Sequence, residues 1–142
     1  MPAATNRVTI GRSPEDVFAF VADGLNARQW RSGVLDIAVA SGSGVGAIYH
    51  QGVAGPGGRR IAADYEVTAY EPARRFAFRT IAGPVRPTGE FRLEPDGEGT
   101  ALTFQLSAEL PLLKRLIMGS MVQKTMDAET QGLAKVKTIL EG

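Results

Sequence analysis

The stretch PLLKRLIMGSMVQKTMDAETQGLAKVKTILE, residues 111–141, decides the fold of this chain. Its apolar residues recur at helical spacing over its whole length, and a helix of about 31 residues is roughly 46 Å long. A helix of this length must lie across a whole sheet, and such packing tends to leave an apolar pocket between the two layers. The stripe that we expect to face the sheet consists of Val122, Met126, Leu133, Val136 and Leu140.

The first half of this helix has a different pattern. Its apolar residues spread around more of the helix surface and turn away from the later stripe, and Gly119-Ser120 lies where the pattern changes. Gly inside a helix costs about 1 kcal/mol relative to Ala, and Gly/Ser pairs are frequent kink sites. The sequence therefore predicts a bend or break at Gly119-Ser120.

The N-terminal third predicts one strand and two short helices. Residues 5–11 alternate apolar and polar side chains, which is typical of a strand. Ser13, followed by Pro14, Glu15 and Asp16, forms a helix start, because the hydroxyl can accept a backbone hydrogen bond and acids suit the positive helix end. A second helical pattern covers residues 26–31.

From residue 34 the period changes to two, which indicates strands joined by short Gly- and Pro-rich turns. Connections this short join neighbours in an antiparallel meander. Ile61, Ala63, Tyr65, Val67 and Ala69 are expected on one face, with polar residues on the other. The predicted strands are residues 34–39, 46–53, 60–70, 75–81, 88–93 and 100–109.

Composition limits the class of protein. The 142 residues, 44% hydrophobic and 22% charged, predict a single domain spanning 1–142. The near balance of 16 basic and 15 acidic residues disfavours nucleic-acid binding, and the absence of Cys excludes disulfides and thiolate chemistry. With one His we expect no metal site, and we expect no cofactor. Without a signal peptide or membrane span, we expect a cytoplasmic protein with no integral membrane association.

Several short motifs occur along the chain in a fixed order. They are Ser13-Pro14-Glu15-Asp16-Val17-Phe18, the spacing from Asp23 to Trp30, Asp64-Tyr65-Glu66-Val67, Tyr70-Glu71-Pro72 before Arg75-Phe76, and Glu94-Pro95 with Gly99-Thr100. Together with the long last helix, they resemble the SRPBCC (START/Bet v 1-like) superfamily, and within it the polyketide cyclase/dehydrase-like branch.

The resemblance implies an α+β helix-grip (Bet v 1-like) fold. In this fold a curved antiparallel sheet of about six to seven strands wraps around a long C-terminal helix, and two short helices follow strand 1. It also implies a deep apolar cavity, which START lipid-transfer domains, polyketide cyclases and coenzyme Q-binding proteins use for different purposes. The branch has no universal catalytic motif to carry over, so function inferred from this fold is analogy.

Polar side chains expected to point inward are the candidates for chemistry. Tyr49, Gln51 and Tyr65 can orient a ligand, or bond to one another, to backbone or to water. Glu129 shares the helix face of the apolar stripe, so its carboxyl either enters the cavity, where burial would suit it for proton transfer, or reaches water at the rim. The alternation along its strand predicts that His50 points to solvent. The side chain most suited to acid–base catalysis near neutral pH is therefore not expected in the cavity.

Inward aromatic residues on the strands are either plain core or pocket walls, and Trp30 is a core anchor, a stacking surface for a planar ligand, or both. The ligand-binding residues that we predict are Trp30, Tyr49, Gln51, Tyr65, Phe78, Phe91, Phe104, Val122, Met126 and Glu129.

Three functions remain open at this point. The first is binding of an apolar or aromatic small molecule, polyketide- or lipid-like, between sheet and helix. The second is a cyclase or dehydratase in which Glu129 is a weak catalytic candidate. The third is a partner-binding or co-chaperone-like domain, or a homodimer, which requires an exposed apolar patch such as residues 112–121.

Overall fold

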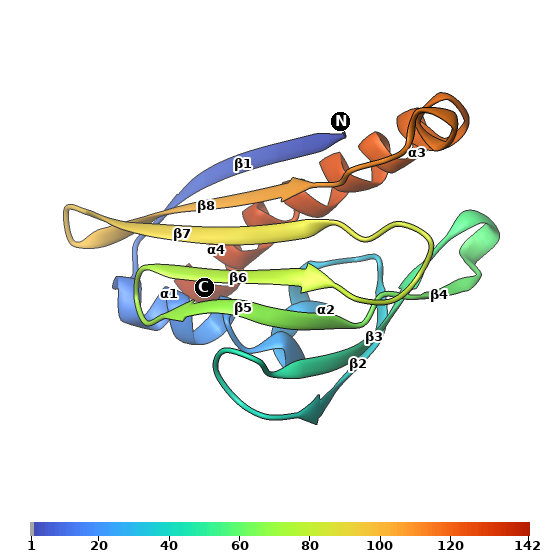
Figure 1. Cartoon of the computed structure of the whole chain (residues 1–142). Coiled ribbons are helices and arrows are strands. Elements are labelled where there is room, and N and C mark those ends of the chain that lie inside the picture. Colours follow the sequence, from blue (N-terminus) through green and yellow to red (C-terminus); the bar gives the residue numbers. More distant parts are fainter. Residues whose placement is uncertain (1) are drawn as a thin grey trace.

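The computed structural model describes residues 2–142 and shows a curved antiparallel sheet with helices packed on one side (Figure 1). This α+β architecture agrees with the prediction. The elements in chain order are β1 (Ala3–Ile10), α1 (Pro14–Val21), the 3-10 turn η1 (Gly24–Asn26), α2 (Ala27–Trp30), β2 (Val34–Ser41), β3 (Ile48–Ala54), the 3-10 turn η2 (Pro56–Gly58), β4 (Arg60–Ala62), β5 (Tyr65–Glu71), β6 (Arg75–Thr80), β7 (Thr88–Asp96), β8 (Gly99–Ser107), α3 (Leu112–Gln131) and α4 (Leu133–Glu141).

The strands pair in the order β1-β8-β7-β6-β5-β3-β2, and β4 pairs with β3 beside this path. All pairs are antiparallel, and β1 pairs with the last strand, β8. The sheet has eight strands, more than the six to seven expected, because the strand predicted over residues 60–70 is interrupted at 63–64 and forms both β4 and β5.

The predicted helix start at Ser13 is confirmed. The Ser13 hydroxyl accepts a hydrogen bond from the Asp16 backbone N–H at 3.2 Å, with Pro in the first turn of α1. The apolar face of α1, which contains Val17, Phe18 and Val21, is buried. The second predicted helix is present as η1 followed by α2.

A register shift in β5 changes which side chains face inward. After Val67 the pairing moves by one residue, so that Tyr70 lies opposite Phe76. Directly opposite residues share a face of the sheet, and the Tyr70 ring indeed lies 5.1 Å from Phe18 on the inner side. The prediction that Ala69 shares the inner face with Val67 is therefore wrong, because the bulge moves Ala69 to the other face.

The long C-terminal helix predicted over 111–141 is confirmed as α3 and α4, which follow each other with one irregular residue between them. The irregular residue is Gly132. A Cβ atom at Gly132 would lie 2.7 Å from the Trp30 carbonyl oxygen, so the missing side chain allows the helices to approach α2 closely. Helix α3 continues without interruption through Gly119-Ser120, which excludes the predicted break there. The predicted bend at these residues stays a prediction.

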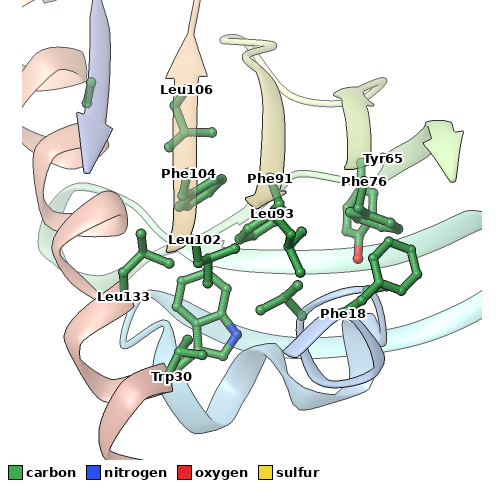
Figure 2. Packing of buried hydrophobic residues seen from close by; sticks show 14 of the residues in the cluster. Phe18, Trp30, Tyr65, Phe76, Phe91, Leu93, Leu102, Phe104, Leu106 and Leu133 are labelled. Atoms are coloured by element: carbon green, nitrogen blue, oxygen red, sulfur yellow. The ribbon is translucent and has the colours of Figure 1, made fainter. Parts of the chain in front are cut away.

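The apolar stripe of the helices packs on the sheet as predicted. Leu133 and Val136 are fully buried, and Val122 and Met126 are nearly so. Figure 2 shows Leu133 of α4 beside Leu102 of β8 and near Trp30, at the side of the core that the helix covers. None of the helices in residues 2–142 is both long and apolar enough to cross a membrane.

Replacing Leu133 with Ala should lower the free energy of unfolding by about 2–5 kcal/mol, because it leaves a cavity at a fully buried position. The matched control is Leu116→Ala in α3, where the side chain is 75% exposed and the change should stay within about 0.5 kcal/mol. Urea denaturation of both variants measures the difference. Equal losses would contradict the described packing of α4.

Candidate functional site

A small void lies inside the protein, between the sheet and the segment from α1 to α2. Its volume is about 20 Å³, which is room for roughly one water molecule. Most of its walls are aromatic, so the interior predicted as a pocket is almost filled by side chains. The void is lined by Val21, Asp23, Gly24, Ala27, Trp30, Arg31, Tyr65, Phe76, Phe78, Phe91 and Phe104.

Three aromatic rings form the densest part of the wall. Phe91 and Phe104 stack with their ring centres 4.3 Å apart, and the Trp30 ring meets both edge-on at 5.8 and 5.7 Å. Figure 2 shows this arrangement, with Trp30 below the two Phe rings of β7 and β8. Trp30 is therefore both a core anchor and a wall of the void, as the sequence allowed.

Two stacked tyrosines lie near the void, and of these only Tyr65 lines it. Tyr49 and Tyr65 stack with ring centres 4.9 Å apart. Gly24 makes room for them, because a Cβ atom there would collide with the Tyr65 hydroxyl and lie 2.6 Å from the Tyr49 ring. Burial raises the pKa of Tyr65 far above its ordinary value, and burial also raises the pKa of Tyr49. Both hydroxyls are therefore neutral hydrogen-bonding groups at neutral pH.

Arg31 joins two of the predicted polar residues. Its guanidinium forms an ion pair with Glu129 of α3 and donates a hydrogen bond to Gln51 Oε1 of β3 at 3.0 Å. The side chains of Arg31 and Glu129 are each 14% exposed. Glu129 does point inward, but its carboxylate is matched by a cation and is not isolated among apolar groups.

Asp64 fixes the strand that carries Gln51. One carboxylate oxygen accepts the Gln51 backbone N–H at 3.0 Å, and the other lies 2.8 Å from His50 Nδ1. Burial opposes ionisation of Asp64, but these two donors outweigh it and hold the pKa of Asp64 below its ordinary value of 3.8. The His50 side chain is 65% exposed, which confirms that it points outward.

The predicted site residues fall into three groups in the structure. Trp30, Tyr65, Phe78, Phe91 and Phe104 line the void. Gln51 and Glu129 meet through Arg31, and Tyr49 supports Tyr65 from outside the lining. The remaining two, Val122 and Met126, are buried in the core and do not line the void.

Arg31 is a polar residue of the candidate site that was not predicted from the sequence. The only signal for it was its position directly after Trp30 at the end of a short helix. Phe76, Asp23 and Ala27 also line the void without having been predicted as site residues. Over residues 2–142, the His, Asp and Glu side chains form no group of three that could hold a metal ion.

A larger cleft of about 430 Å³ lies elsewhere, between the loop before β7 and the start of α3. It contains outward-facing side chains of β7 and β8 and is separate from the aromatic interior. Its lining consists of Pro84, Arg86, Thr88, Ser107, Glu109, Leu110, Pro111 and Lys114.

Replacing Glu129 with Gln should lower the free energy of unfolding by about 1.5–3 kcal/mol, because Arg31 then lacks its charged partner in a poorly solvated position. The control is Glu66→Gln, which breaks a comparable pair with Arg79, whose side chain is 59% exposed, and should cost less than about 1 kcal/mol. Urea denaturation compares the two; a larger loss for Glu66→Gln would contradict the assignment.

Replacing Asp64 with Asn should lower stability near neutral pH by about 1 kcal/mol, through loss of its charged hydrogen bonds. Because the folded pKa lies below the unfolded value, this contribution is complete above about pH 4 and is lost as the pH falls through the folded pKa. The gap between wild type and Asp64→Asn should therefore close on acidification. Thermal unfolding across a pH series measures it, and a constant gap would refute the assignment.

Comparison with known proteins identifies the family. A sequence profile of the family described as polyketide cyclase / dehydrase and lipid transport matches residues 1–141. No curated protein matches the chain in sequence.

Solved structures share the fold at low identity. The protein TTHA0849 from Thermus thermophilus is 20% identical, with 99% of this chain and 97% of that chain covered and a TM-score of 0.82. A START superfamily protein from Mycobacterium smegmatis is 20% identical, with 98% and 97% covered and a TM-score of 0.74. The ZhuI aromatase/cyclase from Streptomyces sp. R1128 is 18% identical, with 98% and 93% covered and a TM-score of 0.71.

These structures confirm the START-like, helix-grip fold implied by the sequence resemblance. Since the family profile spans nearly all of the chain, the protein belongs to the polyketide cyclase / dehydrase and lipid transport family.

Proposed function

We propose that this protein binds an apolar or aromatic small molecule between its sheet and its helices, at the aromatic-lined void. The observation that carries the proposal is the void itself, which has one wall of stacked aromatic rings beside the polar groups of Arg31 and Tyr65. The apolar rings can bury the surface of a ligand, and the few polar groups can orient it through hydrogen bonds. This is the usual composition of a small-molecule site. The names of relatives that are aromatase/cyclases or belong to the START superfamily support the same class of ligand.

Binding requires the interior to expand. A void of about 20 Å³ holds no more than a water molecule, so a ligand must displace wall side chains. Phe78 is the wall residue best placed to move, because it is only partly buried and its ring occupies the space left by Gly89. The proposal is therefore one of binding coupled to opening of the core, with affinity reduced by the cost of that opening.

The alternative of a cyclase or dehydratase places a proton transfer on Glu129. In this structure the Glu129 carboxylate is engaged by Arg31, which favours a role in holding α3 against the sheet over a role as an acid. Loss of turnover on a polyketide substrate in Glu129→Gln, with ligand affinity retained, would favour the enzyme.

The single tryptophan allows a direct test of binding. Trp30 is 3% exposed and lines the void, so energy transfer from Trp30 to the fluorescent probe 1-anilinonaphthalene-8-sulfonate should be saturable. Ala27→Val adds two methyl groups to the wall and should weaken probe binding at least about tenfold, since the added atoms occupy the space that the ligand needs.

The matched control is Ala22→Val, at a similarly buried alanine that does not line the void. It should change the affinity less than about twofold, and thermal melts check that both variants fold. Equal effects of the two substitutions, or no saturable transfer in the wild type, would exclude the interior as the binding site. Native mass spectrometry of protein purified from its own host then identifies any retained ligand.

A further inference from the structure

The first turns of α3 carry large aliphatic side chains that no part of the described chain, residues 2–142, covers. Leu112, Leu113, Leu116 and Ile117 are 64%, 70%, 75% and 73% exposed, and Met121 is 46% exposed. Figure 1 shows this end of α3 beyond the end of β8. Single exposed leucines are ordinary, but five neighbouring aliphatic residues on one helix mark a surface that is covered in function. We call residues 112–121 the α3 tip.

The apolar side chains of the α3 tip are not confined to a narrow stripe. With about 100° of rotation per residue, the directions from Leu112 to Met121 span roughly half of the helix circumference. A helix that packs on one protein surface usually presents a stripe of about 100°. The wider distribution suits a fluid apolar medium that surrounds the helix end.

The charges of this segment are all positive. Lys114, Arg115 and Lys124 lie within residues 110–126, which contain no Asp or Glu. Of the ion pairs formed within the described chain, none includes any of these three. Packing of this segment against a second copy would bring like charges together, and the nearest acids, Glu109 and Asp127, lie just outside its two ends. A surface rich in phosphate matches them instead.

The cleft of about 430 Å³ lies at the base of the α3 tip. Lys114 and Arg86 both line it, together with the hydroxyls of Thr88 and Ser107, whose oxygens are 3.2 Å apart. Glu109 is the one acid in the lining. The two cations and two hydroxyls can bind a lipid phosphate. Because they lie beside an apolar helix end, the aliphatic side chains can contact the acyl region of the same lipids.

We propose that the α3 tip docks on the surface of a membrane containing anionic lipids. The side chains of Leu112, Leu113, Leu116 and Ile117 enter the interfacial region, and Lys114 and Arg86 contact lipid phosphates. This docking does not depend on the interior ligand, so the two proposals succeed or fail separately.

Vesicle co-sedimentation tests the proposal with the whole chain. Wild-type protein should bind phosphatidylcholine vesicles containing about 30% phosphatidylglycerol at least about tenfold more strongly than pure phosphatidylcholine vesicles, and less strongly at high salt. The double variant Leu116→Ser/Ile117→Ser should lose most of this binding. Leu25→Ser/Val45→Ser is the matched control, because it removes two aliphatic side chains that are 51% and 63% exposed elsewhere and should bind like wild type.

A second pair of variants tests the cations. Arg86→Gln/Lys114→Gln should reduce binding to the anionic vesicles at least about tenfold. Arg59→Gln/Arg74→Gln removes the same net charge at exposed positions away from the cleft and should reduce binding much less.

Three results would overturn membrane docking. The first is equal vesicle binding by the α3-tip variant and its control. The second is a particle of two chains in light scattering that Leu116→Ser/Ile117→Ser converts to one, which would assign the surface to self-association. The third is saturable binding of soluble glycerol phosphate without binding to vesicles, which would reduce the cleft to a site for free phosphate.

Discussion

The close contact between Trp30 and Gly132 is the constraint on which the rest of the structure depends. Trp30 ends α2, and its backbone carbonyl approaches the junction of α3 and α4 so closely that a side chain at Gly132 would not fit. Its ring meets Phe91 and Phe104 of the sheet edge-on. One residue thus fixes the distance between the short helices, the C-terminal helices and the sheet, and with it the size of the interior.

That spacing explains why the interior is nearly full. Aromatic rings from β7 and β8 meet Trp30 directly and leave a void of about 20 Å³. The polar groups at its edge are satisfied by the protein itself, through Arg31 bonding to Glu129 and Gln51. A guest molecule would therefore compete with existing contacts, and the protein would exchange its own packing for contacts with the ligand.

The second half of the C-terminal helical region packs on this core, and the first half does not. From Val122 onward the apolar stripe is covered by the sheet, whereas residues 111–117 are exposed and lie past the end of β8. The same helix thus stabilises the fold at one end and presents aliphatic and basic groups to the surroundings at the other. Helical periodicity is present in both halves, so periodicity alone does not distinguish a core face from an exposed apolar surface.

The sequence by itself determined the fold class, the antiparallel pairing of consecutive strands, the capped first helix and the buried stripe of the last helix, because these follow from local hydrogen bonding and from the periods of two and 3.6 residues. The pairing of β1 with β8 was decided by the tertiary structure. Only the tertiary structure decided the bulge that turns Tyr70 inward, the irregularity of the last helix at Gly132, the partner of Glu129 and the volume of the interior. Each of these depends on contacts between residues far apart in the chain, such as Arg31 with Glu129 or Trp30 with Gly132, whose distances no local pattern specifies.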